Sequence, residues 1–258
     1  MPHGARGLAI AAALLLACAG CGGGGGNGGH GQTALGSAKP LPVEVGRNVG
    51  RVPGLSPGDV AAAALLSAYG DGRPPAGWVL VPTSSWQNAV LASQFAAPPV
   101  SAGIVPIKPG FLPSGPADVL ARVRSTGFPK AHGLRAVVLG HAATDVFVDL
   151  QDLGLKLTQL QDPRPASLAA KLVPFRGGWA RSYSGNVVIV SSRESARDYA
   201  LPAAAWSAYS GDTVAFVDDH GVPAATARLL VQRQKLTLDK PTMYVVGPRS
   251  VISDAVLA

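Results

Sequence analysis

The sequence predicts an α/β protein of two tandem Rossmann-like units, each with an open parallel sheet, the last one incomplete at the C-terminus. Short apolar runs that are typical of buried strands alternate with Ala-rich helical segments, which is the pattern of βαβ units and a parallel sheet. The same order of elements then returns: Val79 to Val188 spans 109 positions, and Pro113 to Pro223 spans 110. A nearly constant offset of this size indicates an internal duplication.

The composition indicates a folded protein with a basic surface. Of the 258 residues, 47% are hydrophobic and 14% are charged, so a large core can form and global disorder is excluded. The net charge of +7 favours an anionic partner such as a membrane or a wall polymer, although a GC-rich genome that favours Arg and Ala explains it equally well. Since the sequence has no Lys/Arg-dense run and no nucleic-acid motif, nucleic acid is not an expected partner.

The N-terminus predicts a signal peptide over residues 1–17. Arg6 precedes an apolar run from Leu8 to Ala17, which suits a signal-peptide core and is too short to span a bilayer. The run ends in Leu15-Leu16-Ala17-Cys18, which resembles a bacterial lipobox. We expect Cys18 to be lipidated, with Cys21 as the alternative, and an ordinary signal peptide with incidental cysteines is the remaining interpretation.

Residues 18–48 predict a flexible tether that follows the lipidated cysteine. Eight glycines occur among residues 22–31, and Gly-rich chain behaves as a flexible coil. Both cysteines of the chain lie at this end of the sequence. The folded part therefore has neither a disulfide framework nor a Cys-ligated zinc site.

The first unit is predicted over residues 49–141. Ser56 and Pro57 are typical of a helix N-cap and first helical position, and Asp59 suits the positive end of the helix dipole. Ser85 is expected to cap a second helix, and a Leu-Pro turn leads into a third. Apolar runs predict parallel strands over Trp78–Val81, Gly103–Ile107 and Arg135–Leu139.

The second unit is predicted over residues 142–258. It would open with a short helix over Asp145–Asp152 and a strand over Leu155–Leu160, and Asp162-Pro163 is expected to start the next helix. One turn of helix within Ser250–Ala258 cannot stand alone, so either the unit is truncated or this end packs on something else. The remaining strands are expected over Val187–Val190, Thr213–Val217 and Thr242–Val246.

The same series of motifs runs through both units. In the first unit the motifs are Val79–Val81, Trp86-Gln87-Asn88-Ala89-Val90, Gly103–Ile107, Leu112-Pro113 and Val137–Gly140. In the second unit they are Val188–Val190, Asp198-Tyr199-Ala200, Val214–Val217, Val222-Pro223 and Tyr244–Gly247. Their order and spacing resemble the cell wall-binding repeat type 2 family of bacterial surface proteins. The resemblance implies an open α/β module, usually present in sets of three, that attaches non-covalently and without catalysis to an anionic wall polymer.

The carboxyl edge of the predicted sheets carries the candidate binding residues. Ligands of open α/β sheets meet this edge, and helix N-termini there favour anions. Lysine and arginine residues at this edge would add positive charge, unless they are ordinary solvated loop residues. The resemblance adds residues at the helix starts, where Asn88 stands in place of the family's Asp, and a tryptophan there would stack on a sugar or pack in the core. The polymer-binding candidates are Trp86, Asn88, Lys108, Arg193, Asp198 and Arg249.

No catalytic residue, metal site or cofactor is predicted. Asp218-Asp219-His220 holds acid, base and ligand side chains, but adjacent residues of a turn seldom converge on one site. The sequence has no Gly-x-Ser-x-Gly elbow. Its paired glycines, Gly177-Gly178 and Gly70-Asp71-Gly72, do not lead from an apolar strand into a helix as a dinucleotide fingerprint does.

These observations predict a non-catalytic cell wall-binding surface lipoprotein. It would lie outside the cytoplasm, anchored to the plasma membrane by its lipid and associated with an anionic wall polymer, teichoic-acid-like or another wall glycan. The alternative is a lipid-anchored extracytoplasmic solute-binding protein whose ligand lies between the two units. Packing of repeats within or between chains is a further expectation.

Overall fold

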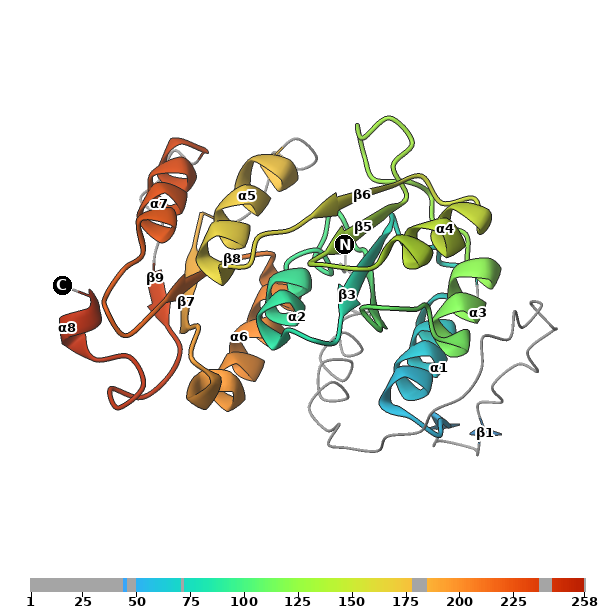
Figure 1. Cartoon of the computed structure of the whole chain (residues 1–258), viewed down its shortest axis with the longest axis horizontal. Coiled ribbons are helices and arrows are strands. Elements are labelled where there is room, and N and C mark those ends of the chain that lie inside the picture. Colours follow the sequence, from blue (N-terminus) through green and yellow to red (C-terminus); the bar gives the residue numbers. More distant parts are fainter. Residues whose placement is uncertain (1–43, 46–49, 71, 178–184, 237–242, 258) are drawn as a thin grey trace, which may run out of the picture.

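Two parallel sheets, each covered by helices, lie side by side (Figure 1). The computed structural model describes residues 44–45, 50–70, 72–177, 185–236 and 243–257. Within these ranges the chain is an α/β protein with one four-stranded and one smaller, three-stranded parallel sheet, which confirms the predicted fold class. Among the helices of these ranges, none is both long and apolar enough to cross a membrane.

The first sheet has the strand order β4-β3-β5-β6, and all neighbouring strands are parallel. Its strands are β3 (Trp78–Pro82), β4 (Gly103–Ile107), β5 (Ala136–Leu139) and β6 (Leu157–Leu160). Its helices are α1 (Pro57–Tyr69), α2 (Trp86–Ser93), α3 (Ser114–Arg122) and α4 (Thr144–Asp152). A short antiparallel pair, β1 (Glu44–Val45) and β2 (Gly50–Arg51), precedes them.

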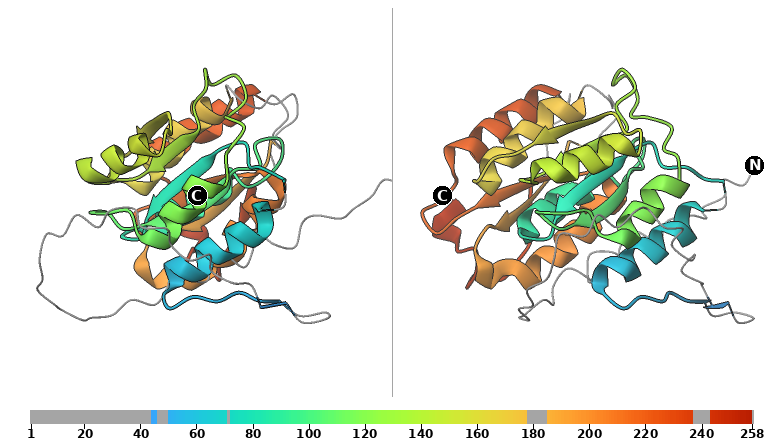
Figure 2. Two further views of the ribbon diagram at one scale, coloured as in Figure 1. Left: turned by 90° about the vertical axis from the view of Figure 1, so that its right-hand side faces the viewer. Right: turned by 45° about the vertical axis from the view of Figure 1, so that its right-hand side comes forward.

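The second sheet has the strand order β8-β7-β9, again with parallel neighbours. Its strands are β7 (Val187–Ser191), β8 (Thr213–Val217) and β9 (Met243–Val245). Its helices are α5 (Pro165–Gly177), the 3-10 turn η2 (Glu194–Ala196), α6 (Arg197–Ser210), α7 (Ala224–Leu236) and α8 (Asp254–Leu257). Figure 2 shows helices on both faces of the sheets, which is why the central strands β3, β5 and β7 are buried along their whole length.

The two sheets repeat one topology. In each, the first strand lies in the middle, with the second strand on one side and the third on the other, so β3, β4 and β5 correspond to β7, β8 and β9. Trp78 of β3 pairs with Gly103 of β4. Their counterparts 109 and 110 positions later, Val187 and Thr213, pair in the same way. The offset seen in the sequence is therefore an offset between equivalent positions in space.

Strand β6 belongs to the first sheet, whereas the sequence analysis places Leu155–Leu160 in the second unit. Leu157 of β6 pairs with Ala136 of β5, and α4 makes the crossover between the two parallel strands. A strand's own periodicity does not indicate which sheet edge it joins. The first sheet therefore extends to Leu160, beyond the predicted limit at residue 141.

Helix α5 starts two residues later than Asp162-Pro163 predicts. Its first residue is Pro165, so the proline preference for the first helical position is met by a different proline. Asp162 instead accepts a hydrogen bond at Oδ1 from the backbone N–H of Arg164, at 3.0 Å. That bond makes a local turn ahead of the helix.

Capping side chains place two other helix starts as predicted. The Ser56 hydroxyl accepts from the Asp59 backbone N–H at 3.2 Å, and the Asp59 carboxylate accepts from the Ser56 N–H at 3.1 Å, which is a capping box. The Ser85 hydroxyl accepts from the Asn88 N–H at 3.3 Å and caps α2. Both caps supply acceptors for backbone groups that a helix leaves without partners.

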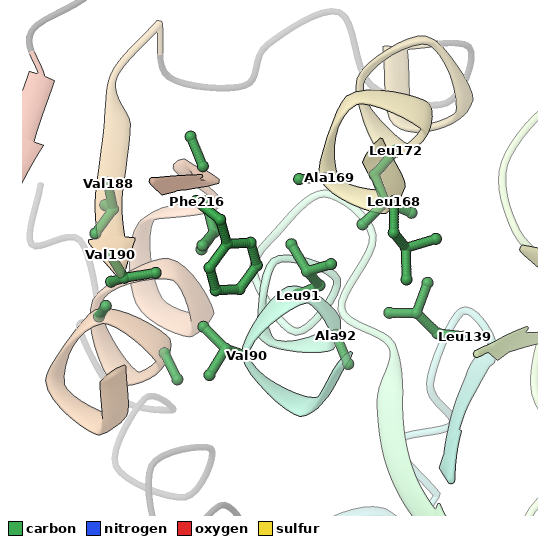
Figure 3. Close-up of a cluster of buried hydrophobic side chains, with 14 of the residues drawn as sticks. Val90, Leu91, Ala92, Leu139, Leu168, Ala169, Leu172, Val188, Val190 and Phe216 are labelled. Carbon is green, nitrogen blue, oxygen red and sulfur yellow. The ribbon is translucent and has the colours of Figure 1, made fainter. Parts of the chain in front are cut away.

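Helix α2 joins the two units through one shared hydrophobic core. Figure 3 shows its residues Val90 and Leu91 between α5 and the strands of the second sheet. The α5 side contributes Leu168 and Leu172, and the sheet side contributes Phe216. Every one of these side chains is buried, so the seam between the units is packed like a protein interior.

A buried guanidinium reinforces this seam at the end of α2. Arg176 of α5 donates to the Gln94 side-chain oxygen at 2.6 Å and to the Gln94 backbone oxygen at 3.0 Å. It also donates to the Gly211 carbonyl at 2.9 Å and lies over the Phe95 ring, 5.7 Å from its centroid. Buried charges are stable only when such partners satisfy them, and here the partners come from both units.

We predict that Leu91→Ala destabilises both units together. Leu91 is fully buried in the shared core, so its truncation should cost about 2–5 kcal/mol of unfolding free energy. Urea denaturation followed by circular dichroism and by tryptophan fluorescence should show one transition, shifted to lower urea. Val231→Ala, at a position 51% exposed on α7, is the control and should change stability by less than about 0.5 kcal/mol. Two separate transitions would contradict a single core.

Candidate functional site

Each sheet has a point where the chain reverses its direction of strand addition. From β3 the chain adds β4 on one side and then returns to add β5 on the other. The second sheet does the same at β7, between β8 and β9. In open α/β sheets, ligands bind in the crevice outside the carboxyl ends of the strands at such a point.

A groove of about 710 Å³ lies at this point of the first sheet. Its walls come from the loops that follow β3, β5 and β6, from helices α2 and α5, and from the residue after β7 in the second unit. Hydroxyl, amide and imidazole groups dominate the lining, together with one ion pair. The lining residues are Ser84, Ser85, Gln87, Asn88, Gly140, His141, Gln161, Asp162, Pro163, Pro165, Lys171 and Ser192.

Asn88 and Gly140 fix the floor of the groove by a close contact. Gly140 follows β5 with φ of +119°, a left-handed value that favours glycine. A Cβ atom added there would collide with the Asn88 side-chain nitrogen. The Gln159 amide also donates to the Gly140 carbonyl, at 2.9 Å. The backbone conformation therefore favours glycine after β5, and a larger residue there would also displace the Asn88 amide.

Asp162 and Lys171 form the ion pair on the groove wall. The Lys171 ammonium lies 2.9 Å from the Asp162 carboxylate and also donates to the Gln161 carbonyl at 2.9 Å. The hydrogen bond from Lys171 lowers the pKa of Asp162 below its ordinary value of 3.8, and the backbone N–H of Arg164 lowers it further. Asp162 is therefore a carboxylate at neutral pH, and the pair adds no net charge to the groove.

The predicted residue Trp86 lies in the seam between the units. Its indole N–H donates to the Glu194 carboxylate of the second unit at 2.7 Å, and its ring meets Phe216 edge-on at 6.3 Å. The neighbouring Gln87 donates to the Ser192 carbonyl at 3.1 Å. These contacts explain the position of the Trp86 side chain by packing between the units. The stacking of Trp86 on a sugar stays a prediction.

The three predicted cations each follow a strand at the carboxyl edge, and two of them are paired with neighbouring acids. Lys108 follows β4 and is half-buried. Arg193 follows β7 and pairs with Asp219 at 2.8 Å. Arg249 follows β9 and pairs with Asp254 at 3.4 Å. Both arginines are exposed and stay accessible to an anion that displaces the acid.

The other predicted residues have different surroundings in the two units. Asp198 is exposed at the start of α6. A Cβ built at Gly247 of the second unit would meet Ile252 and Val251 at 3.8 Å and the Tyr199 Cβ at 3.9 Å, all ordinary contact distances. The second unit therefore lacks the close amide contact that Asn88 makes with Gly140. The predicted lipid anchors Cys18 and Cys21 lie outside the residues that the structure describes.

Several groove residues were missed by sequence analysis, and β6 is the reason. Asp162, Lys171 and Gln161 reach the groove because β6 ends beside β5 in the first sheet. Ligands of open α/β sheets bind at the carboxyl ends of the strands. Once β6 is assigned to the first sheet, this rule predicts these three residues as groove residues. His141 reaches the groove because it directly follows Gly140 at the end of β5.

Asp218-Asp219-His220 does not converge on one site. The Asp218 carboxylate accepts from the His220 backbone N–H at 2.8 Å, which is a local turn. Asp219 points instead to Arg193. Over the described ranges, no group of three or more His, Cys, Asp or Glu side chains is arranged to hold a metal ion.

Comparison with known proteins shows a likeness of fold. No family model matches the sequence, and no curated protein matches it. The structure is similar to Cwp6 from Clostridium difficile, with a TM-score of 0.65 and 12% identity over 83% of this chain and 32% of that chain. It is also similar to Cwp8 from Clostridium difficile, with a TM-score of 0.59 and 14% identity over 80% of this chain and 32% of that chain. This chain therefore matches 32% of the length of each of these neighbours.

Gly140→Ala should destabilise the protein more than Gly133→Ala does. Both glycines have a left-handed φ, +119° and +79°, which costs a non-glycine residue about 1–2 kcal/mol. A Cβ at Gly133 meets no atom within 4 Å, whereas at Gly140 it meets Asn88. Displacing the end of the Asn88 side chain should add about 1 kcal/mol, the low end of overpacking costs, to the Gly140→Ala loss in unfolding free energy. Asn88→Ala in the Gly140→Ala background should recover part of it, and equal losses for the two glycines would contradict the contact.

Lys171→Met should raise the pKa of Asp162 towards 3.8, because it removes the hydrogen bond that holds that pKa down. Carbon-13 NMR titration of the carboxyl group measures the change, and Lys156→Met, at a lysine bonded to the His132 carbonyl, is the control. The folded-state pKa is the lower one, so this contribution to stability is present above about pH 3.8 and is lost as pH falls through the folded-state pKa. An unchanged pKa in Lys171→Met would show that the pair does not form in solution.

Proposed function

We propose that this chain is a non-catalytic cell wall-binding surface lipoprotein. The observation that carries the proposal is the likeness of fold to Cwp6 over 83% of this chain and to Cwp8 over 80% of it, both of them cell wall proteins. The tandem repeat of one α/β unit gives a second support, because repeated modules present an extended series of similar surfaces.

The proposed partner is an anionic cell-wall polymer. The chain carries a net charge of +7, which favours association with an anionic partner. Lys108, Arg193 and Arg249 follow strand ends at the carboxyl edge, where helix N-termini also favour anions. The hydroxyl and amide groups of the groove, together with Asn88, would bond the polymer's sugars. Asp198, at the exposed start of α6, would accept hydrogen bonds from polymer hydroxyls.

The proposed location is outside the cytoplasm, with the chain held to the membrane by lipid. The leader over residues 1–17 and its lipobox-like end support Cys18 as the lipidated residue, with Cys21 as the alternative. Residues 18–48, Gly-rich over 22–31, would then act as a tether between the membrane and the units, flexible up to the short strand β1 at Glu44–Val45. This arrangement sets the units at a distance from the membrane at which they meet the wall.

The alternative of a solute-binding protein with its ligand between the two units is not favoured. The space between the units is filled by α2, whose Val90 and Leu91 are buried against both α5 and the second sheet. Arg176 closes the same seam with hydrogen bonds to both units. A ligand could enter this seam only if the packed core opened, which would expose the apolar side chains that join the units. The groove also borders both units, through Lys171 and Ser192, and there the proposal places the sugars of the wall polymer.

We expect the protein to sediment with purified cell walls and to be released by salt, because exposed charge contacts are screened. Reversing Lys108, Arg193 and Arg249 to Glu together should weaken wall binding. Three surface contacts, two from exposed arginines and one from the half-buried Lys108, at about 0.5 kcal/mol each amount to roughly a tenfold loss of affinity. A sedimentation assay over a range of wall concentrations measures the loss.

The matched control reverses three exposed arginines away from the carboxyl edge, Arg73, Arg124 and Arg228. It changes the net charge by the same amount, so equal losses for the two triple variants would indicate non-specific attraction. Failure of the unmodified protein to sediment above a control protein would overturn the wall-binding proposal.

A further inference from the structure

An open hollow of about 530 Å³ lies at the amino ends of strands β7 and β8, the opposite end of the fold from the groove. It is bounded by the last turns of α6 and by the residues just before the two strands. We call it the aromatic hollow, and it is lined by Asn186, Trp206, Tyr209, Ser210 and Asp212. Neither the packing of the core nor the proposed wall contacts at the carboxyl edge uses these side chains.

Two aromatic side chains of the hollow are exposed to solvent. Tyr209 is 67% exposed and Trp206 is 39% exposed, one turn apart on α6. The Trp206 ring also packs on Tyr244 of β9, with ring centroids 4.6 Å apart, so it is held in a fixed position. Exposed rings that are held in place form a surface on which the apolar face of a ligand can stack.

A buried carboxylate with a spare oxygen lies beside these rings. Asp212 is only 1% exposed, and its Oδ2 accepts from the Trp206 indole N–H at 2.7 Å. Its Oδ1 is buried and has no hydrogen-bond partner within the part of the chain that the structure describes. A buried acceptor without a donor destabilises the folded state, so such atoms call for an explanation.

The first unit shows that the fold itself does not need this carboxylate. In the second unit the Thr213 N–H donates to the Asn186 carbonyl, and in the first unit the Gly103 N–H donates to the Gly77 carbonyl. The residue before Gly103 is Ala102, which is buried without any polar side chain. An alanine thus satisfies the same backbone position, so the backbone does not require Asp212, and the Trp206 indole N–H occupies only one of its two oxygens.

We propose that the aromatic hollow binds a sugar ring, which stacks on Tyr209 and Trp206 and donates a hydrogen bond to Asp212. An ionised carboxylate only accepts hydrogen bonds, so the ligand group that meets it must be a hydroxyl or an amine. The torsion of a terminal carboxylate is soft, which lets the two oxygens share the indole N–H and a ligand donor. A phosphate or carboxylate ligand would be repelled, so this site takes uncharged or amino sugars and is separate from contacts with an anionic polymer.

The test uses two defined sugars and the full-length chain. N-acetylglucosamine trimer offers uncharged donors, and glucosamine trimer offers ammonium donors. Isothermal titration calorimetry should show binding of both, tighter for glucosamine trimer because a charged donor strengthens the bond to a carboxylate. Tyr209→Ala should weaken both sugars about tenfold, and Asp212→Asn should weaken glucosamine trimer about tenfold.

Tyr199→Ala is the matched control, since Tyr199 is another exposed tyrosine of α6 but lies beside Gly247 at the carboxyl edge. It should bind both sugars as the unmodified chain does. Absence of binding to either sugar, or an equal loss in Tyr199→Ala and Tyr209→Ala, would overturn the proposal. Should Asp212→Asn fail to fold, the comparison of the two tyrosine variants still decides the outcome. Wall sedimentation is measured separately, so failure of wall binding and failure of this site are distinguishable.

Discussion

The packing of α2 into the second unit is the interaction on which the rest of the structure depends. Its buried side chains, with Leu91 at their centre, meet α5 and the second sheet in one core (Figure 3). The guanidinium of Arg176 adds directional bonds to Gln94 and Gly211 at the end of the same seam. Hydrophobic packing is not directional, so these buried polar bonds select one alignment of the units among those that the apolar surfaces would allow.

One duplicated frame carries two different sets of side chains. The glycine after the third strand is kept in both units, with a left-handed φ at Gly140 and at Gly247. The Asn88 amide lies over the first glycine, whereas Ile252, Val251 and Tyr199 surround the second at ordinary contact distances. Before the second strand, Ala102 in one unit is matched by Asp212 in the other. Positions that the backbone requires have stayed constant, and positions open to solvent or ligand have diverged.

The proposed functions use opposite ends of the second sheet. The carboxyl edge carries cations, of which Arg193 and Arg249 are paired with neighbouring acids and would exchange these for groups of an anionic polymer. The amino end carries the aromatic hollow, where the proposed ligand would donate a hydrogen bond to the Asp212 carboxylate. A wall polymer contains both charged groups and sugar rings. A protein with one site at each end of the sheet would bind the charged groups at one site and the sugar rings at the other.

The sequence by itself determined the elements, their caps and their repetition. Strands such as Thr213–Val217 are apolar runs of the right length, and Ser56 with Asp59 encodes a helix start within four residues. These features are local, so they are readable without a fold. Only the tertiary structure decided that β6 joins the first sheet, that Trp86 packs in the seam, and that Asp162 and Lys171 reach the groove. Those outcomes depend on contacts between residues far apart in the chain, which no local pattern specifies.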